Sequence, residues 1–247
     1  MQTAEYQALR ALEDQYWWHA GLRQLTLSHL HLGQAPAILD LGCGTGGNLA
    51  LLRRELPQAR LHGADLHPLA IALARDRHAG ALCRTSANAL PYRDEYFDAV
   101  LALDVFYALE VDEAAALRES RRVLKPGGLL LVNLPAFEAL RGAHDEAVHT
   151  RERYTAPELR AKLAAAGFEV ERLTCWNTLL LPLLYAWRKL SPRQGSDLAP
   201  LHPALNGLLK TALRIERLLF AAVDLPVGSS LFAVARRPNG TSVPSSS

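Results

Sequence analysis

Apolar and polar positions alternate regularly along the chain between residues 37 and 135. Short, mostly apolar runs are predicted to be strands, and they lie at 37–41, 60–66, 81–86, 97–103 and 128–135. The segments between them carry apolar residues at helical spacing. Pro68 suits the first turn of one helix, and Asp112 suits the N-cap of another that runs to Leu124, with a stop and turn predicted at 125–128. This alternation predicts a parallel sheet with helices on both faces.

The same alternation weakens after Pro135 and returns near residue 155. Thr155 and Glu158 have the spacing of a capping box, and Gly167 follows the last helical turn, so a further helix and a sixth strand are expected there. A final strand is expected at 230–237. Between these two strands, the leucine-rich segments 178–190 and 204–226 predict two amphipathic helices inserted before the last strand.

Composition and charge narrow the class of protein. The 247 residues are 49% hydrophobic, which allows one large domain with a substantial core. Lys and Arg total 27 against 25 Asp and Glu, for a net charge of +2, so no nucleic-acid partner is expected. The three scattered cysteines form no CxxC pair, and neither a disulfide framework nor a metal site is expected. With no signal peptide or apolar membrane span recognised, we expect a cytoplasmic protein.

The most informative stretch is ILDLGCGTGGNL, residues 38–49, which has four glycines within six residues. Glycines at a strand-to-helix bend let backbone N–H groups approach a ligand, and the helix that follows offers its positive end to an anion. The spacing of Gly42, Gly44 and Gly47 satisfies GxGxxG, the dinucleotide pattern, so a nicotinamide-dependent oxidoreductase is one hypothesis. The bend suits a pyrophosphate or a carboxylate equally well.

Two aspartates lie close to this bend. Asp40 stands two residues before the first glycine, where its charge would repel a pyrophosphate and attract a cationic amine. Asp65 closes the second predicted strand, where a carboxylate can accept hydrogen bonds from both hydroxyls of a ribose. Asp65 is compatible with either class of ligand, whereas Asp40 favours an ammonium group.

The chain resembles the class I S-adenosylmethionine-dependent methyltransferases. The resemblance rests on an ordered set of motifs: D-x-G-x-G-x-G at 40–46, Asp65, ANALPY at 87–92, FDAVLALD at 97–104 and LRESRRVLKPGGLLLVNLP at 117–135. It covers roughly residues 16–175 and the last strand. It implies an α/β, Rossmann-like, seven-stranded and mostly parallel sheet with helices on both faces and an antiparallel last strand. The cofactor would lie across the carboxyl ends of the first strands.

The resemblance also implies roles for individual residues. S-adenosylmethionine would be the cofactor and S-adenosylhomocysteine the product. The residues implied to bind it are Asp40, Gly42, Cys43, Gly44 and Gly46 for the methionine part, Asp65 for the ribose, Leu66, Ser86, Ala87 and Asn88 for the adenine, and Leu103 and Asp104 beside the sulfonium. Two positions depart from the family pattern, because Ser86 stands where many members have an aspartate and Ala108 where a histidine is often found.

Residues 1–35 are expected to form an N-terminal helical lid. The stretch YWWHAGLR, residues 16–23, places three aromatic side chains ahead of the first strand, and similar segments in the family close over the cofactor. Trp17 or Trp18 is predicted to cover the cofactor, and Arg23 to pair with its methionine carboxylate. The alternative is that these aromatic residues simply pack the helix onto the sheet.

Candidates for acid–base chemistry gather in the stretch AHDEAVHTRERYT, residues 143–155. His144 or His149 is predicted to act as a base or to orient the acceptor, because the unperturbed pKa of histidine lies near neutrality. Tyr154 is the third candidate catalytic residue. A solvated polar loop is the alternative, and a metal site is disfavoured because no third ligand is evident.

We therefore expect a single domain over 1–238, made of the lid 1–35, a cofactor-binding core 36–175, inserted helices 176–228 and the last strand 229–238, with a disordered tail at 239–247. The expected function is methyl transfer to a small or medium-sized, possibly apolar or lipid-like acceptor, with oxygen preferred over nitrogen or carbon. A noncatalytic S-adenosylmethionine-binding protein is a further alternative. The inserted helices carry more apolar surface than one sheet face can bury, so helix packing, a homodimer, a peripheral membrane contact and an apolar acceptor all remain open.

Overall fold

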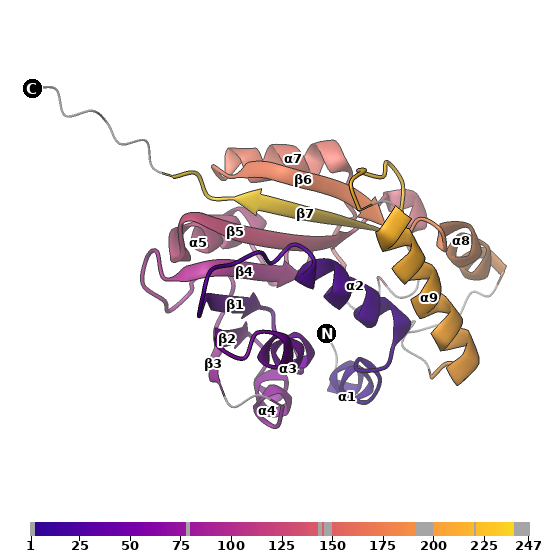
Figure 1. The fold of residues 1–247 in the computed structure, drawn as a ribbon, viewed down its shortest axis with the longest axis horizontal. Coiled ribbons are helices and arrows are strands. Elements are labelled where there is room, and N and C mark those ends of the chain that lie inside the picture. The colour runs from indigo at the N-terminus through magenta and orange to yellow at the C-terminus, as the bar shows by residue number, and fades with distance from the viewer. Residues whose placement is uncertain are drawn as a thin grey trace, which may run out of the picture.

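A computed structural model describes residues 3–77, 80–142, 145, 150–190, 200–219 and 221–239. One seven-stranded sheet runs through it in the order β3-β2-β1-β4-β5-β7-β6, and Figure 1 shows helices on both of its faces. Strand β7 is antiparallel to its neighbours β5 and β6, and every other pairing is parallel. The predicted fold class is therefore confirmed. The strands are β1 (Ala37–Leu41), β2 (Arg60–Asp65), β3 (Ala81–Arg84), β4 (Phe97–Leu103), β5 (Leu124–Pro135), β6 (Glu169–Trp176) and β7 (Ser230–Arg236).

Helices flank this sheet. Further helices precede the first strand and lie just before the last strand in sequence. Within the described residues, two helices precede β1, where a helical lid was expected, and two lie between β6 and β7, where two inserted helices were predicted. The helices are α1 (Thr3–Leu12), α2 (Trp17–Leu27), α3 (Gly47–Glu55), α4 (Pro68–Arg75), α5 (Glu113–Val123), α7 (Ala156–Ala165), α8 (Leu181–Leu190) and α9 (Pro203–Leu219), with a 3-10 turn η1 (Glu138–Leu140). The expected tail at 239–247 lies, apart from Asn239, outside the described residues.

The core has two halves, one on each face of the sheet. Every residue of β1 is buried, and successive side chains point to opposite faces: Ile38 joins one cluster, while Leu39 and Leu41 join the other. Helices α5 and α7 cover the face of Leu39, and helices α2, α3, α4 and α9 cover the face of Ile38. Burial on both sides explains why the central strands have nearly continuous apolar sequences.

The local signals read from the sequence have the expected structural basis at two helices. The side chain of Asp112 accepts a hydrogen bond from the Ala115 N–H at 3.1 Å and begins α5. The capping box of α7 is present between Thr155 and Glu158. Gly167 follows α7 with a φ of +80°, a conformation that glycine adopts without steric cost.

The segment 125–128 differs from its prediction as a stop and turn. It belongs to β5, which begins at Leu124, and the register with β4 shifts between the pairs Phe97–Leu124 and Ala99–Leu129. The backbone N–H of Gly127 donates to the Arg237 carbonyl at 2.8 Å, and the Arg237 N–H donates to the Gly128 carbonyl at 2.9 Å. These bonds to the distant end of β7 keep a Pro-Gly-Gly sequence inside a bulged strand.

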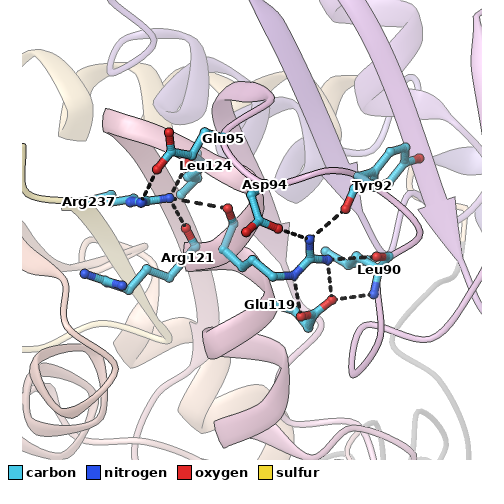
Figure 2. Close-up of polar contacts among 9 residues, drawn as sticks. Leu90, Tyr92, Asp94, Glu95, Glu119, Arg121, Leu124 and Arg237 are labelled. Carbon is cyan, nitrogen blue, oxygen red and sulfur yellow. Dashed lines mark hydrogen bonds and ion pairs between the residues drawn. The ribbon is translucent and has the colours of Figure 1, made fainter. Parts of the chain in front are cut away.

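The loop between β3 and β4 is anchored to α5 by one arginine. Arg122 donates to the carbonyl oxygens of Leu90 at 2.9 Å and Tyr92 at 2.7 Å, and to the carboxylates of Asp94 at 2.7 Å and Glu119 at 2.8 Å. Figure 2 shows these contacts together with the Leu90 N–H, which donates to Glu119 at 2.7 Å. This loop begins with the turn at 86–88, so Arg122 holds a segment that borders the predicted cofactor site.

Replacing Arg122 by Met tests this anchor. The variant keeps the length of the side chain but leaves two loop carbonyls without their charged donor, so we expect the free energy of unfolding to fall by about 1.5–3 kcal/mol. Urea denaturation measures the change. The control is Arg160→Met, because Arg160 is exposed on α7 and forms no ion pair within the described part of the chain. Equal unfolding midpoints for the two variants would contradict the anchoring role.

Candidate active site

The glycine bend turns the chain from β1 into α3. Gly42, Gly44 and Gly46 have φ angles of +69°, +52° and +81°, in the left-handed region that side chains disfavour. A Cβ atom at Gly42 would also overlap the Val105 side chain, and one at Gly46 would lie 3.0 Å from the backbone of Ala74. The bend therefore needs glycine both for its conformation and for its close packing.

A cavity of about 860 Å³ opens where this bend meets the carboxyl ends of β1, β2 and β4. Its wall also includes side chains from α1, α2, α8 and α9. Eleven of the predicted cofactor-binding residues lie on the wall: Trp17, Arg23, Gly42, Cys43, Gly44, Asp65, Leu66, Ser86, Ala87, Leu103 and Asp104. Asp40, Gly46 and Asn88 are not on the wall. The structure thus brings most of the predicted set to one place.

Asp65 is the acceptor at the end of β2. Its Oδ2 accepts the Gly44 N–H at 3.0 Å, and its Oδ1 accepts the His67 N–H at 2.8 Å. Burial raises the pKa of this carboxyl, although these two hydrogen bonds oppose the shift. Each carboxylate oxygen retains further acceptor capacity, and the neighbouring Leu66 is 47% exposed. A carboxylate beside an open apolar side chain fits a ribose diol joined to a flat ring.

Asp40 lies behind the cavity wall, where sequence analysis expected it to face the ligand. It is 1% exposed, and among the described residues its Oδ2 has no hydrogen-bond partner. Burial raises the pKa of Asp40 to about 7, although a hydrogen bond from Asn48 and the charge of Arg23 oppose the shift. Asn48 does line the cavity, in the first turn of α3. Asn48 therefore connects the buried Asp40 carboxyl to the cavity. Sequence analysis did not identify Asn48 as a site residue.

Arg23 lines the cavity but already has a carboxylate partner. Its Nη2 lies 2.7 Å from Glu13 Oε2, and its Nε donates to Asn48 Oδ1 at 3.3 Å. Glu13 is 5% exposed, accepts a hydrogen bond from the Thr45 hydroxyl, and lies 3.2 Å from Arg77. Glu13, from the turn after α1, thus ties the N-terminal helices to the glycine bend. Because Glu13 belongs to no sequence motif, this contact could not be predicted from the sequence.

The aromatic residues of the N-terminal segment both pack and border the cavity. Trp17 is 6% exposed and lines the cavity, and its backbone N–H donates to Asn206 of α9 at 2.9 Å. The Trp18 ring lies 5.4 Å from the Trp176 ring. On α1, the Tyr6 ring stacks on His67 with centroids 4.6 Å apart. The same side chains therefore pack the N-terminal helices and border the cavity.

Asp104 follows β4 and has a φ of +63°, which is unusual for a residue with a side chain. Its Oδ1 accepts a hydrogen bond from Asn133 Nδ2 at 2.9 Å, and Asn133 Oδ1 accepts from Trp176 Nε1 at 2.7 Å. Burial raises the pKa of Asp104 to about 7. This chain of hydrogen bonds fixes a carboxyl that titrates near neutral pH on the cavity wall.

The predicted catalytic residues are only partly described. His144 and His149 lie outside the described residues. Tyr154 is 1% exposed and does not line the cavity; its hydroxyl donates to Glu152 at 3.1 Å, and Lys162 lies 4.6 Å from its ring centroid. Burial raises the pKa of Tyr154. Tyr154 forms an isolated bridge with Ala136, and its side chain belongs to the core cluster.

Three other residues of the same stretch, Asp145, Thr150 and Arg153, do reach the cavity. Asp145 and Arg153 both line it and form a buried ion pair, with two N–O distances of 3.0 Å. Arg153 also donates to the carbonyl of Ala136 at 2.8 Å. Since each charge is satisfied by the other, the pair shapes the cavity wall and joins Asp145 to Arg153 next to the end of β5.

Known proteins resemble this chain in sequence and in fold. A family model for a methyltransferase domain matches residues 39–132. The chain is 32% identical to malonyl-[acyl-carrier protein] O-methyltransferase of Herminiimonas arsenicoxydans, over 94% of this chain and 91% of that protein. It is 36% identical to demethylmenaquinone methyltransferase of Thermus thermophilus, over 57% of this chain and 78% of that protein. A solved methyltransferase in complex with the Haloferax volcanii activator Trm112 superposes with a TM-score of 0.66 at 21% identity, covering 95% and 98% of the two chains.

The chain belongs to the class I S-adenosylmethionine-dependent methyltransferases. Its activity is the transfer of a methyl group from S-adenosylmethionine. The oxidoreductase and the noncatalytic protein considered from the sequence are therefore set aside. The cavity fits the family's cofactor on its own evidence, since it combines an open glycine bend with an acceptor carboxylate at Asp65, and behind its wall Asp40 has a buried carboxyl oxygen with no hydrogen-bond partner among the described residues.

The raised pKa of Asp40 predicts how cofactor binding depends on pH. We expect the ionised carboxylate to attract the ammonium of the ligand strongly, because Asp40 is 1% exposed and little water screens its charge. With a pKa of about 7, the ionised fraction rises with pH, and we expect the affinity for S-adenosylhomocysteine to rise about tenfold from about pH 6 to about pH 8. Titration calorimetry at several pH values measures this change.

Two isosteric variants separate Asp40 from the other carboxyl that titrates in this range. Asp40→Asn removes the titrating group, so its affinity should be lower and nearly independent of pH. Asp104→Asn should retain the pH dependence of the native chain. A pH dependence that survives in Asp40→Asn and disappears in Asp104→Asn would assign the effect to the wrong residue and refute the prediction.

Proposed function

We propose that the chain methylates a small or medium-sized acceptor with a large apolar part, and that the accepting atom is an oxygen. The observation that carries this proposal is the composition of the cavity. One part is bordered by the glycine bend and Asp65, and the other by Leu180, Leu184 and Leu209 of the inserted segment. Its volume of about 860 Å³ is near the upper end for ligand pockets, about 300–1,000 Å³. Two ligands can therefore lie side by side.

S-adenosylmethionine supplies the methyl group on a sulfonium, with a thioether as the leaving group. We assign Asp65 to the ribose hydroxyls, Leu66 to one face of the adenine, and the turn at 86–88 to its edge. The turn is held in place by Asn88, which donates to the Glu110 carbonyl at 3.3 Å and accepts the Asp112 N–H at 3.0 Å. The N–H groups of Gly42, Gly44 and Gly46 already donate within the chain, so we assign the anionic end of the ligand to the positive end of α3, which follows the bend.

Three charged side chains, Arg23, Glu13 and Asp40, lie on or behind the wall where we place the amino-acid end of the ligand. We assign Arg23 to its carboxylate and Asp40, acting across Asn48, to its ammonium. Arg23 is already paired with Glu13 at 2.7 Å, so we propose that one guanidinium serves both carboxylates, since its five N–H donors form a fork. Trp17 covers this end of the cavity, as its position on the wall supports.

The chain's contribution to the reaction is mainly to hold the acceptor in line with the transferred group. Such positioning is worth about 7–11 kcal/mol. Asp104 borders the cavity at the end of β4 and has a pKa of about 7, so it suits removal of a proton from a hydroxyl or orientation of the acceptor. His144 and His149 remain candidates for the same task. The buried Tyr154, bonded to Glu152, is a weaker candidate.

We choose the acceptor class from the cavity, because the relatives act on different acceptors. The two named above act, by name, on a malonyl-[acyl-carrier protein] and on a demethylmenaquinone. Their acceptors share no single head group, so we choose the class from the leucine-rich wall. We further propose that the chain works in the reducing cytoplasm, in keeping with its three free cysteines, and that it takes no nucleic acid.

Replacing Asp104 by Asn tests its part in catalysis. If Asp104 removes a proton, kcat should fall about 100- to 10,000-fold. The assay measures S-adenosylhomocysteine formed from S-adenosylmethionine with a panel of alkyl carboxylic acids and alkylphenols, each compared with its short-chain analogue. The kcat of the native chain should rise through about pH 7, because the ionised form is the base, and the variant should lack this rise. An unchanged kcat and pH profile would exclude Asp104 from proton transfer.

The apolar wall is tested by Leu209→Asn, with Leu219→Asn as the control. Leu209 lines the cavity, whereas Leu219 of the same helix is 64% exposed. Losing one buried leucine contact costs about 1.5–3 kcal/mol, so KM for a long-chain acceptor should rise at least about tenfold. The affinity for S-adenosylhomocysteine should stay within about twofold. Equal KM values for both variants would contradict an apolar acceptor site at α9.

A further inference from the structure

The exposed apolar side chains of this protein are concentrated on the inserted helices. Ten of the twelve large hydrophobic residues found exposed in the described part of the chain lie between residues 179 and 227: Leu179, Leu183, Tyr185, Leu205, Leu208, Ile215, Leu218, Leu219, Val223 and Val227. Figure 1 shows α8 and α9 together at the end of the molecule where the parallel strands terminate. A concentration of this kind marks an interaction surface.

Helix α9 has one packed face and one open face. On the packed face, Leu213 is 5% exposed, and the Glu216 carboxylate accepts the backbone N–H groups of Asn177 at 2.5 Å and Leu179 at 2.8 Å. On the open face, Leu208 is 65% and Leu218 is 69% exposed. These two leucines lie ten residues apart, with Ile215 between them at helical spacing. The open leucines therefore form a stripe along the helix, which no described residue covers.

The charges that border this stripe are all positive. Lys210 and Arg214 lie on α9, and neither forms an ion pair with a described carboxylate, whereas Arg217 lies on the packed side beside Leu213. The one acidic residue of the helix, Glu216, is buried against the backbone. Nearby Asp224 is paired with Arg172 at 3.1 Å. The surface thus offers leucine side chains and uncompensated cations together.

An anionic lipid bilayer complements both features. A helix with leucines on one face and Lys or Arg beside them lies in the headgroup region, with its apolar side chains inserted and its cations near the lipid charges. A second copy of the chain would meet the same surface, and symmetry would bring like charges together. Crossing the bilayer is not involved, since none of the described helices is sufficiently long and apolar for that.

We propose that the surface formed by α8, α9 and the turn to Val227 docks this protein peripherally on membranes that contain anionic phospholipids. The stripe is continuous with the cavity, because Leu183 and Leu205 line the cavity and are also 57% and 44% exposed. Docking therefore brings the mouth of the cavity to the bilayer, where an acceptor with a hydrocarbon chain resides. This last step rests on the proposed function, whereas the docking itself does not.

Vesicle co-sedimentation of the full chain tests the proposal. The probes are vesicles of pure phosphatidylcholine and vesicles that contain phosphatidylglycerol at about one lipid in three, at low and high salt. The protein should sediment with the anionic vesicles at low salt and much less with the neutral ones. Leu208→Ser, Leu218→Ser and the pair Lys210→Glu with Arg214→Glu should each weaken binding at least tenfold.

Matched controls change the same residue types elsewhere. Leu109→Ser alters a leucine that is 61% exposed away from α9, and Arg53→Glu with Arg160→Glu changes the net charge by the same amount from α3 and α7. These variants should bind anionic vesicles as the native chain does. All variants should retain the native affinity for S-adenosylhomocysteine, which separates this test from that of the methyl-transfer site.

Three results would overturn the proposal. The first is no sedimentation of the native chain with anionic vesicles. The second is an equal loss of binding in the control variants, which would reduce the effect to overall charge. The third is a stable dimer by analytical ultracentrifugation that Leu208→Ser dissociates, without any vesicle binding, because a second copy would then cover the stripe.

Discussion

The structure depends on how three carboxyl groups are held at one edge of the sheet. Asp40, Asp65 and Asp104 lie at the carboxyl ends of β1, β2 and β4, three neighbouring strands. Burial raises the pKa of all three. Burying a carboxylate is costly unless donors or cations satisfy it. Here backbone N–H groups satisfy Asp65 and an amide satisfies one oxygen of Asp104, while an oxygen of Asp40 has no described partner.

In the proposed function, each of these three carboxyl groups has a separate role. Asp65 is fixed by the glycine bend, so it presents acceptor positions in a set direction to the adenosine part of a ligand. Asp40 is poorly satisfied, so it gains most when a cation binds nearby. Asp104 lines the cavity and is held through Asn133 and Trp176. In the proposed function, cofactor binding and acceptor chemistry fall to different carboxyl groups of one edge.

Much of the fold could be predicted because its signals are local. The bounds of β1 and β4 match the predicted runs, and the caps of α5 and α7 follow from single residues. The segment 125–128 could not be predicted, since its conformation depends on hydrogen bonds to Arg237, over a hundred residues away. Most of the cofactor-binding residues predicted from sequence motifs likewise lie on the cavity wall. The motifs could not indicate Glu13 or Asn48, whose roles arise only when α1 and α3 meet beside Arg23.

The central claim is that this carboxyl edge binds S-adenosylmethionine and its product. The most direct measurement is a crystal structure of the chain grown with S-adenosylhomocysteine. The account predicts the ribose hydroxyls on the Asp65 carboxylate, the adenine against Leu66 and the ammonium beside Asn48, in front of Asp40. A ligand bound elsewhere on the chain, or one in this cavity with its adenosine turned away from Asp65, would contradict the account.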